Sequence, residues 1–312
     1  MEIIHLCPAK LATGGTENIH QLVSELRKCG ADAKILYEGK DLRNPQPKEY
    51  EKYDCPYITS MPDNFKGAII FPEIWGNRVA SSLYDKITTI INWQGVDVYY
   101  WGVREDEKNL FLKNRKTLHM TTMDYGMAHL QSLGIKGIRV SDCLNDLYFQ
   151  DFVESSTRTD TVLYNPTSIK LTKFQQAVMS KCRTELGLRF LPLQGYTTNQ
   201  LIEIFRTHKL YIDFGVFSGR ERLPREAAMC GCCVLTSKLG AAGYHRDVAI
   251  PDEYKMDDVD ATVEKIQYIL NNYEQCVPDF EEYRNSLRQD KENYHNEVKE
   301  LYNAILSCNA RI

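Results

Sequence analysis

The stretch KLYIDFGVFSGRERLPREAAMCGCCVLT, residues 209–236, constrains the fold more than any other part of the chain. Residues 210–214 form a short apolar run that is typical of a buried strand. Pro224 stands where a helix is expected to begin, because its fixed φ suits the first helical turn. Gly231 should end that helix, and residues 233–235 restart a strand. This order predicts a βαβ unit, with its ligand site at the carboxyl edge of the sheet.

Charged side chains crowd the loop and the first turns of this helix, namely Arg220, Glu221, Arg222, Arg225 and Glu226. A helix N-terminus attracts anions, and arginine forks bind phosphate oxygens in pairs. A carboxylate just inside the helix can accept hydrogen bonds from a ribose diol. The pattern therefore fits a site for a nucleotide diphosphate. The alternative is a solvated charged loop before an ordinary amphipathic helix.

The second half of the stretch resembles the donor-site motif of GT-B-fold glycosyltransferases. That motif has one glutamate, seven residues, a second glutamate, then alanine and a turn ending in Cys-Gly. The matching residues here are Pro224, Glu226, Ala227, Cys230 and Gly231. The second glutamate of the family binds the nucleotide ribose, so the resemblance implies that role for Glu226. It also implies phosphate contacts from Arg220, Arg222 and Arg225.

The first half of the motif departs from the family pattern. The position eight residues before Glu226 is Ser218 rather than glutamate, and Pro224 lies two residues before Glu226 rather than three. Glu221 is a candidate substitute in a shifted register. The departure leaves both the usual contact to the sugar and the choice between a retaining and an inverting reaction open.

At 312 residues the chain is long enough for two domains. The resemblance implies an α/β fold of two Rossmann-like domains facing a cleft, with a C-terminal helix that packs back on the first domain. We expect an acceptor-side domain at 1–155, a nucleotide-sugar domain at 156–285 and the returning helix at 286–312. Residues 146–160 would be the linker, because they hold a polar cluster.

Composition excludes several classes of protein. The net charge of −4 argues against a nucleic-acid partner bound by bulk positive potential. The longest apolar runs are far shorter than the ~20 residues of a membrane span, and the amino terminus does not read as a signal peptide. The ten cysteines lack zinc-ligand spacing, so we expect buried free thiols, no metal site and a cytoplasmic location.

The first domain opens with a strand at 2–7, a glycine-containing loop and a helix from about Asn18 to Lys28. Gly14-Gly15 is not a GxGxxG fingerprint. It resembles the amino-terminal loop of GT-B enzymes, which implies that the Gly15 backbone approaches the donor or the acceptor. A plain glycine turn is the alternative.

Two further donor contacts are implied by the resemblance. Lys170, in the first loop of the second domain, is the candidate for the family's phosphate-binding lysine. Tyr196 follows the strand at 189–193 and would stack on the base, or simply pack. The loop after Thr236, with Gly240, would close over the sugar-phosphate end.

The expected mechanism stabilises the leaving diphosphate with Lys170 and the arginines, Arg225 among them, and uses neither a metal ion nor a cofactor. An inverting reaction also needs a general base. Glu17, Asp97 and His119 in the first domain are the candidates. Aromatic residues 99–101 beside Asp97 suit either sugar binding or a core under a loop.

The remaining periodicity predicts the other elements. Strands are expected at 33–37, 68–71, 86–92, 117–122, 137–141, 161–164 and 189–193, and helices at 78–84, 124–132, 199–207, 259–271 and 279–305. Residues 39–65 are expected to be a loop on the acceptor side.

The sequence thus predicts a glycosyltransferase whose partners are a nucleotide-sugar donor and a glycan or lipid-linked acceptor. The identities of base, sugar and acceptor stay open, as does the oligomeric state. Peripheral contact with the inner membrane face, through Lys108, Lys113, Arg115 and Lys116, competes with a solvated charged face. A non-catalytic binding protein on the same fold, or another Rossmann-type enzyme such as an epimerase or dehydrogenase, remain alternatives.

Overall fold

The computed structural model describes residues 1–78, 87–102, 117–150, 158–167 and 171–309. The chain divides into two compact units. The first holds Met1–Cys143 and Lys291–Ile312, and the second holds Leu144–Asp290. The final helix α9 (Glu281–Asn309) therefore contributes its first turns to the second unit and the rest to the first. The three-part division at 155/156 and 285/286 stays a prediction.

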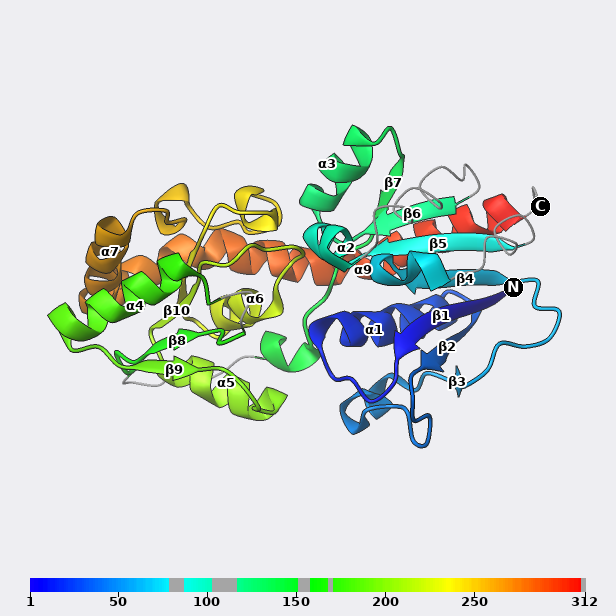
Figure 1. Cartoon of the computed structure of the whole chain (residues 1–312), viewed down its shortest axis with the longest axis horizontal. Coiled ribbons are helices and arrows are strands. Elements are labelled where there is room, and N and C mark those ends of the chain that lie inside the picture. The colour runs from blue at the N-terminus through cyan, green and yellow to red at the C-terminus, as the bar shows by residue number, and fades with distance from the viewer. Residues whose placement is uncertain (79–86, 103–116, 151–157, 168–170, 310–312) are drawn as a thin grey trace. The chain divides into compact units, whose positions relative to one another are not determined.

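The first unit is built on a seven-stranded sheet in the order β3-β2-β1-β4-β5-β6-β7, with every neighbouring pair parallel (Figure 1). Its strands are β1 (Glu2–Pro8), β2 (Asp32–Glu38), β3 (Tyr57–Ile58), β4 (Ala68–Pro72), β5 (Thr88–Trp93), β6 (Thr117–Thr121) and β7 (Gly137–Arg139). The chain passes from β1 outward to β3 and then returns to the other side of β1. The strand order therefore reverses between β1 and β4, at a topological switch point.

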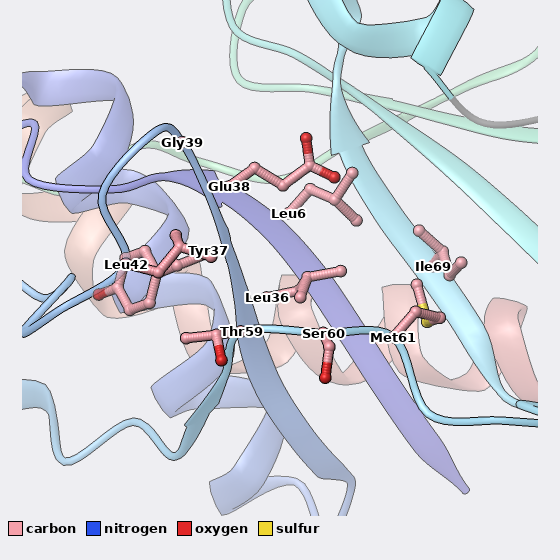
Figure 2. A pocket seen from close by; sticks show the side chains of 10 residues that line it. All are labelled: Leu6, Leu36, Tyr37, Glu38, Gly39, Leu42, Thr59, Ser60, Met61 and Ile69. Atoms are coloured by element: carbon pink, nitrogen blue, oxygen red, sulfur yellow. The ribbon is translucent and has the colours of Figure 1, made fainter.

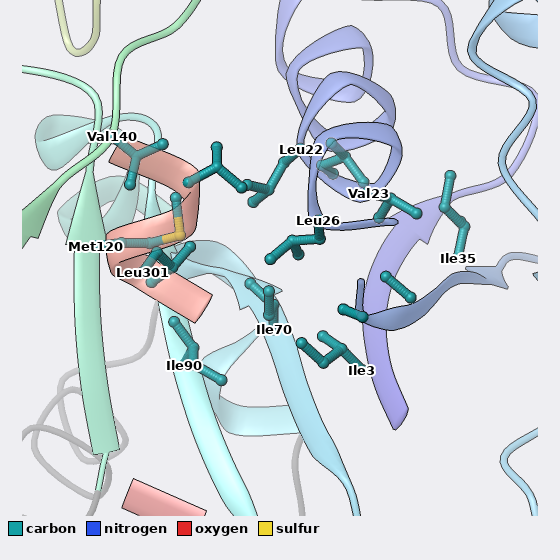
Figure 3. Packing of buried hydrophobic residues seen from close by; sticks show 14 of the residues in the cluster. Ile3, Leu22, Val23, Leu26, Ile35, Ile70, Ile90, Met120, Val140 and Leu301 are labelled. Atoms are coloured by element: carbon teal, nitrogen blue, oxygen red, sulfur yellow. The ribbon is translucent and has the colours of Figure 1, made fainter. Parts of the chain in front are cut away.

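The helices of the first unit are α1 (Gly14–Lys28), α2 (Val96–Gly102), α3 (Asp124–Ser132) and most of α9, with 3-10 turns η1 (Lys48–Tyr53) and η2 (Glu73–Arg78). One core contains apolar residues of α1 and α9 packed on the sheet. Figure 3 shows Leu26 of α1 and Leu301 of α9 beside Ile3, Ile70 and Ile90. A second core covers part of the opposite face. Burial on both faces explains why these strands are apolar runs rather than alternating ones.

Helix α1 begins at Gly14, four residues earlier than the sequence analysis expected. The reason is a capping box, in which Thr13 accepts from the backbone N–H of Thr16 while the Thr16 hydroxyl accepts from the N–H of Thr13. Gly14 and Gly15 thus lie in the first helical turn rather than in a loop. The expected loop at 39–65 was also wrong in part, since it contains η1 and β3.

The second unit is built on a four-stranded parallel sheet in the order β11-β10-β8-β9. Its strands are β8 (Val162–Tyr164), β9 (Phe190–Pro192), β10 (Leu210–Asp213) and β11 (Cys233–Thr236). Its helices are α4 (Lys173–Leu186), α5 (Thr198–Thr207), α6 (Arg222–Met229), α7 (Val259–Asn271) and α8 (Tyr273–Cys276), with 3-10 turns η4 (Asp146–Phe149), η5 (Ala241–Gly243), η6 (Asp252–Tyr254) and η7 (Val277–Phe280). The chain goes from β8 to β9 on one side, then to β10 on the other. The switch point of this unit lies between β8 and β10.

Two helices, α3 and α7, were predicted to the residue. Helix α6 was placed correctly but begins at Arg222, two residues before the expected start at Pro224. Proline fits inside the first turn because the N–H groups there have no helical partner to lose. The helix expected at 78–84 falls almost wholly outside the described residues. No helix within the described ranges is long and apolar enough to cross a membrane.

Candidate functional site

The switch point of the second unit brings together the loops that follow β8 and β10. Such a crevice, at the carboxyl ends of parallel strands, is where open α/β sheets bind ligands. The loop after β8 includes Lys170, which lies outside the described residues. The loop after β10, residues 214–221, carries the charged cluster and leads into α6. The structure therefore places the predicted donor segment at the position that fold topology favours for a ligand.

Buried side chains hold the start of the β10–α6 loop. Asp213 is fully buried, and its two carboxylate oxygens accept from the Gly215 N–H and the Tyr211 hydroxyl, both at 3.2 Å. The side chain of Gln175 on α4 accepts from the Phe214 N–H at 3.0 Å. The sequence analysis missed both roles. A polar residue ending a buried strand was the only signal for Asp213.

A second loop, residues 237–243 after β11, is joined to the first by backbone contacts. The Ser237 hydroxyl donates to the Gly215 carbonyl at 2.9 Å. Phe217 donates its N–H to the Leu239 carbonyl at 3.2 Å and accepts from the Ala241 N–H at 2.8 Å. The two loops are therefore held together at the carboxyl edge of β10 and β11. The expectation that the second loop closes over the sugar-phosphate end of the donor stays a prediction.

Gly240 is required for that joining, and its replacement by alanine tests it. Gly240 has φ +64°, and a Cβ there would lie 2.2 Å from the Phe217 carbonyl oxygen. We expect Gly240→Ala to lower the free energy of unfolding by about 2–4 kcal/mol, because backbone strain and a backbone clash add together. Gly187 also has φ +64° but would meet nothing within 4 Å. Gly187→Ala should cost only about 1–2 kcal/mol in urea denaturation. Equal costs would contradict the close packing of the two loops.

Arg225 supports the loop from inside. Its side chain is fully buried, with Nε donating to the Glu221 carbonyl at 3.0 Å and Nη2 to the Arg220 carbonyl at 2.6 Å. These bonds hold two backbone carbonyls just before and at the N-cap of α6. The geometry favours a positioning role for Arg225, whereas the sequence analysis expected a direct contact to phosphate and a catalytic role. Arg222, at the first position of α6, is half-buried.

Arg220 is a buried cation with unused donors. It is 5% exposed, and its Nη1 donates to Asp290 Oδ2 at 2.5 Å. Its Nε and Nη2 are buried and have no hydrogen-bond partner in the described structure, and the same holds for the nearby Tyr283 hydroxyl. Burial lowers the pKa of Arg220, but Asp290, Tyr283 and Asp247 raise it further, so the group stays charged. Unpaired donors of a buried cation are uncommon and call for an explanation.

Glu226 lies in the second turn of α6 and is 7% exposed. Its negative charge acts on the Tyr211 hydroxyl. The pKa of Tyr211 is raised well above its usual value, first by burial and then by the charges of Asp213, Glu221 and Glu226. Tyr211 is fully buried. The predicted ribose ligand is therefore near the carboxylates that border the β10–α6 loop.

Tyr196 follows β9 at the same edge of the sheet and is 37% exposed. Strand β8 lies between β9 and β10. Since neighbouring strands are about 4.8 Å apart, the carboxyl ends of β9 and β10 are separated by roughly 10 Å. An exposed ring at that spacing suits the base end of a nucleotide.

The switch point of the first unit, between β1 and β4, is lined by a buried polar network. The Gln94 side chain donates to the Gly15 carbonyl and to Asn18 Oδ1, each at 3.1 Å. A Cβ on Gly15 would lie 2.6 Å from the Gln94 side-chain oxygen, so a larger residue there would displace the Gln94 side chain. Glu73, which follows β4, accepts from the N–H groups of Gln94 and Gly95 at 3.1 and 3.0 Å. The sequence analysis named Gly15 but did not foresee Gln94 or Glu73.

Glu73 makes stability depend on pH. Burial raises its pKa to about 7, against the opposing effect of its backbone N–H bonds. The folded state therefore keeps a proton that the unfolded chain loses near its ordinary pKa, so this contribution to stability falls as pH rises from about 4.5 to 7. The loss should reach about 3 kcal/mol.

Urea denaturation of wild type and Glu73→Gln between pH 4.5 and 8 measures this contribution. The difference in free energy of unfolding between wild type and Glu73→Gln should shift against wild type as pH rises. Buried histidines such as His5 and His119, whose pKa values burial lowers to about 3 and 4, act in the opposite sense but are common to both proteins. A difference that does not change with pH would contradict the assignment.

The three candidate bases lie in different surroundings. Glu17 Oε1 accepts from the Tyr53 hydroxyl at 2.6 Å and pairs with Lys52 at 3.2 Å. His119 is 3% exposed and its Nδ1 accepts from the indole N–H of Trp93 at 3.1 Å. Its burial lowers its pKa, which favours a neutral core histidine over a base.

Asp97 is half-buried at the start of α2. Its Oδ1 accepts from the Tyr125 hydroxyl at 3.3 Å, while its buried Oδ2 has no hydrogen-bond partner among the described residues. This buried oxygen can still accept a hydrogen bond. Tyr99, on the same helix, is fully buried against Trp93 with ring centroids 5.0 Å apart, so this ring belongs to the core and not to a sugar-binding surface.

A pocket of about 350 Å³ lies in the first unit, over β1, β2 and β4. Figure 2 shows Leu6, Leu36 and Ile69 on these strands, with the segment from Thr59 to Met61 along one side. Part of its wall thus comes from the 39–65 segment that the sequence analysis placed on the acceptor side. The pocket combines apolar side chains with hydroxyls and the carboxylate of Glu38, in keeping with a small-molecule site.

The cysteines take structural positions. All ten are free, and Cys230, Cys232 and Cys233 are buried where α6 leads into β11. Burial raises the pKa of each of these thiols, so they stay protonated. The part of the chain that the structure describes contains no group of three or more metal-ligating residues.

Neither protein-family models nor curated protein sequences match this chain. Solved structures do. Sucrose-phosphate synthase from Thermosynechococcus elongatus matches with a TM-score of 0.70 at 14% identity, over 98% of this chain and 99% of that one. HepE from Anabaena, in complex with UDP and glucose, matches with a TM-score of 0.68 at 10% identity, over 98% and 99%. An α-glucosyltransferase in complex with UDP and a mismatched DNA 13-mer matches with a TM-score of 0.59 at 11% identity, over 98% of each chain.

These matches confirm the predicted fold class. The chain has the GT-B glycosyltransferase fold, with a seven-stranded and a four-stranded parallel sheet. At 10–14% identity the likeness concerns the fold alone. The chemistry of this chain has to be argued from its own residues.

Proposed function

We propose that this protein is a glycosyltransferase that moves a sugar from a nucleotide-diphosphate sugar to a glycan, lipid-linked or other acceptor. The observation that carries the proposal is Arg220, a buried cation with two unpaired donors where β10 leads into α6. A buried donor left without a partner costs about 1–3 kcal/mol. The Arg220 side chain has no exposed surface in this structure. It would turn toward the loop for the oxygens of a diphosphate to satisfy these donors, next to a helix N-terminus that also favours negative charge.

Each donor contact has a proposed role. Arg220, Arg222 and Lys170 bind the diphosphate, Glu226 accepts from the ribose hydroxyls, and Tyr196 stacks on the base. Arg225 fixes the backbone of residues 220 and 221 and so aims the side chain of Arg220. Because fixed cations would neutralise the leaving diphosphate, the proposed reaction needs no metal ion.

In the proposed reaction the bond between the anomeric carbon and the diphosphate oxygen breaks with its electron pair on the diphosphate. An acceptor hydroxyl oxygen forms the new bond to that carbon and loses its proton. In an inverting reaction Asp97 takes that proton through Oδ2. In a retaining reaction the departing diphosphate oxygen takes it, so no protein base is needed. Glu17, already paired with Tyr53 and Lys52, is the weaker candidate.

The acceptor is proposed to bind the first unit. The pocket over β1, β2 and β4 would hold part of it, with Leu6, Leu36 and Ile69 against an apolar portion, as in a lipid-linked glycan, and Glu38 against a hydroxyl. Such an acceptor would fit a role in polysaccharide biosynthesis, with the protein in the cytoplasm at the inner face of the membrane. The basic patch proposed to contact the membrane lies outside the described residues. One matched glucosyltransferase was solved in complex with DNA, so proteins of this fold can bind nucleic acid. The net charge of −4 does not favour a nucleic-acid acceptor for this chain.

Turnover separates the proposal from its alternatives. The protein is incubated with a panel of sugar nucleotides, with and without glycan and lipid-linked acceptors, and nucleoside diphosphate release is measured. Release with one donor, lost in Glu226→Gln, supports the glycosyltransferase. Binding without any release would favour a non-catalytic protein, and binding of NAD alone would favour a dehydrogenase or epimerase.

A further inference from the structure

The second unit contains a pocket of about 310 Å³ that the proposed function does not use. It lies between η4, the C-terminal end of α6, α8 and the first turns of α9. The residues that matter for its chemistry are Tyr148, Arg158, Met229, Tyr273, Arg284 and Arg288. Its size falls at the lower end of small-molecule sites.

The pocket carries a net positive charge. Among the described residues that line it are three arginines, Arg158, Arg284 and Arg288, and one acidic residue, Glu281. The formal balance of these residues is three minus one, or +2. Burial raises the pKa of Glu281, but Arg284 and Arg288 lower it further, so the pair stays ionised. A cavity with this balance is complementary to a dianion, such as a phosphate monoester.

Arg158 has a structural explanation. Its Nη1 donates to the carbonyls of Phe205 and His208 and its Nη2 to that of Cys230, each at 2.8 Å. Its guanidinium also lies 5.4 Å from the ring centre of Tyr273. Arg158 therefore caps the C-terminal ends of α5 and α6 and forms a fixed wall of the pocket.

Arg284 has a donor to spare. Its Nε donates to Glu281 Oε2 at 2.9 Å and its Nη2 to the Val277 carbonyl at 3.1 Å. The residue is only 8% exposed. Its Nη1 is buried and has no hydrogen-bond partner within the described chain. An anion in the pocket would complete the hydrogen bonding of this buried cation.

Arg288 supplies a second, more adaptable cation. Its Nη1 donates to Glu281 Oε1 at 3.0 Å and to Asn285 Oδ1 at 2.7 Å. Its side chain is 47% exposed. Arg284 and Arg288 lie one helical turn apart on the same side of α9, so both can contact one group.

We propose that this pocket binds the phosphoryl group of a small phosphorylated molecule. Arg284 Nη1 and Arg288 contact the phosphoryl oxygens, and the apolar part of the ligand packs on Tyr148 and Met229. The pocket is separate from the donor loop: it lies at the C-terminal end of α6, and the donor loop precedes its N-terminus. An eight-residue helix is about 12 Å long. The inference does not depend on the proposed glycosyl transfer.

Binding of inorganic phosphate is the first test. Calorimetric titration at constant ionic strength, with chloride as the balancing anion, compares wild type with Arg288→Gln, a half-exposed position where folding should be kept. We expect affinity to fall about tenfold, as for the loss of one charge-assisted contact. Arg183→Gln, at an exposed arginine of α4, is the control and should leave the phosphate affinity unchanged.

Crystals soaked in selenate locate the anion. An anomalous peak within hydrogen-bond distance of Arg284 Nη1, absent in Arg288→Gln crystals, supports the site. Selenate only at the β10–α6 loop, or phosphate affinity equal in wild type and Arg288→Gln, would overturn the proposal. Arg284→Gln should lower the phosphate affinity further if the variant folds. If it does not fold, the comparison of wild type with Arg288→Gln tests the proposal by itself.

Discussion

Glu226→Gln is expected to weaken binding of the cognate nucleoside diphosphate about 10- to 100-fold while the protein stays folded, as for hydrogen bonds to a charged group. Glu226 lies in the second turn of α6 at 7% exposure, close to the loop that carries Arg220. Glutamine keeps the volume and one acceptor oxygen but removes the charge on which two ribose hydroxyls would depend. Calorimetric titration of wild type and variant measures the loss.

A matched control separates this effect from a general loss of negative charge. Glu203→Gln, on α5 of the same unit, makes the same chemical change at a side chain that is 74% exposed. Its nucleotide affinity should equal that of wild type. If folded Glu226→Gln also binds like wild type, Glu226 is not the ribose ligand.

Arg225→Met is expected to lower both the stability of the fold and the affinity for nucleotide. The change removes the donors to the Glu221 and Arg220 carbonyls from a fully buried position. Leaving those groups without partners should cost about 2–4 kcal/mol in urea denaturation. Because these bonds fix the backbone of Arg220, nucleotide affinity should fall as well, even where the variant is still folded.

The control for this variant is Arg189→Met, which makes the same substitution at an exposed arginine just before β9. It should change the free energy of unfolding by no more than about 0.5 kcal/mol. A stable Arg225→Met protein with weakened binding would instead support the direct phosphate contact that the sequence analysis expected. A stable variant with normal binding would contradict both roles.

Much of the fold could be predicted because short stretches of the sequence carry the signals for individual helices and strands. Helix α7 has four apolar residues at helical spacing and an Asp258 cap, and both of its ends were predicted. Helix α1 started earlier than expected because its capping box, Thr13 with Thr16, does not have the usual glutamate or glutamine at its third position.

The site could be predicted in part. The charged run at 220–226 and its resemblance to a known motif indicated the β10–α6 segment. The supports of that segment come from far along the chain: Gln175 from α4, Ser237 after β11 and Asp290 from α9. Nothing local marks these residues, since only folding brings them to the loop. The inward orientation of Arg225 is a separate case, since the carbonyls that it contacts are only four and five residues away and the charged run did not reveal which of its side chains face inward.

Thermal unfolding in the presence of UDP, GDP, dTDP, CMP and NAD tests the central claim, a nucleotide-diphosphate site at the switch point of the second unit. A ligand that binds only the folded state stabilises it, by about 2.7 kcal/mol at a concentration of 100 Kd. The account predicts that one nucleoside diphosphate raises the melting temperature of wild type and raises it much less in Glu226→Gln. A shift with NAD alone, or no shift with any nucleotide, would contradict it.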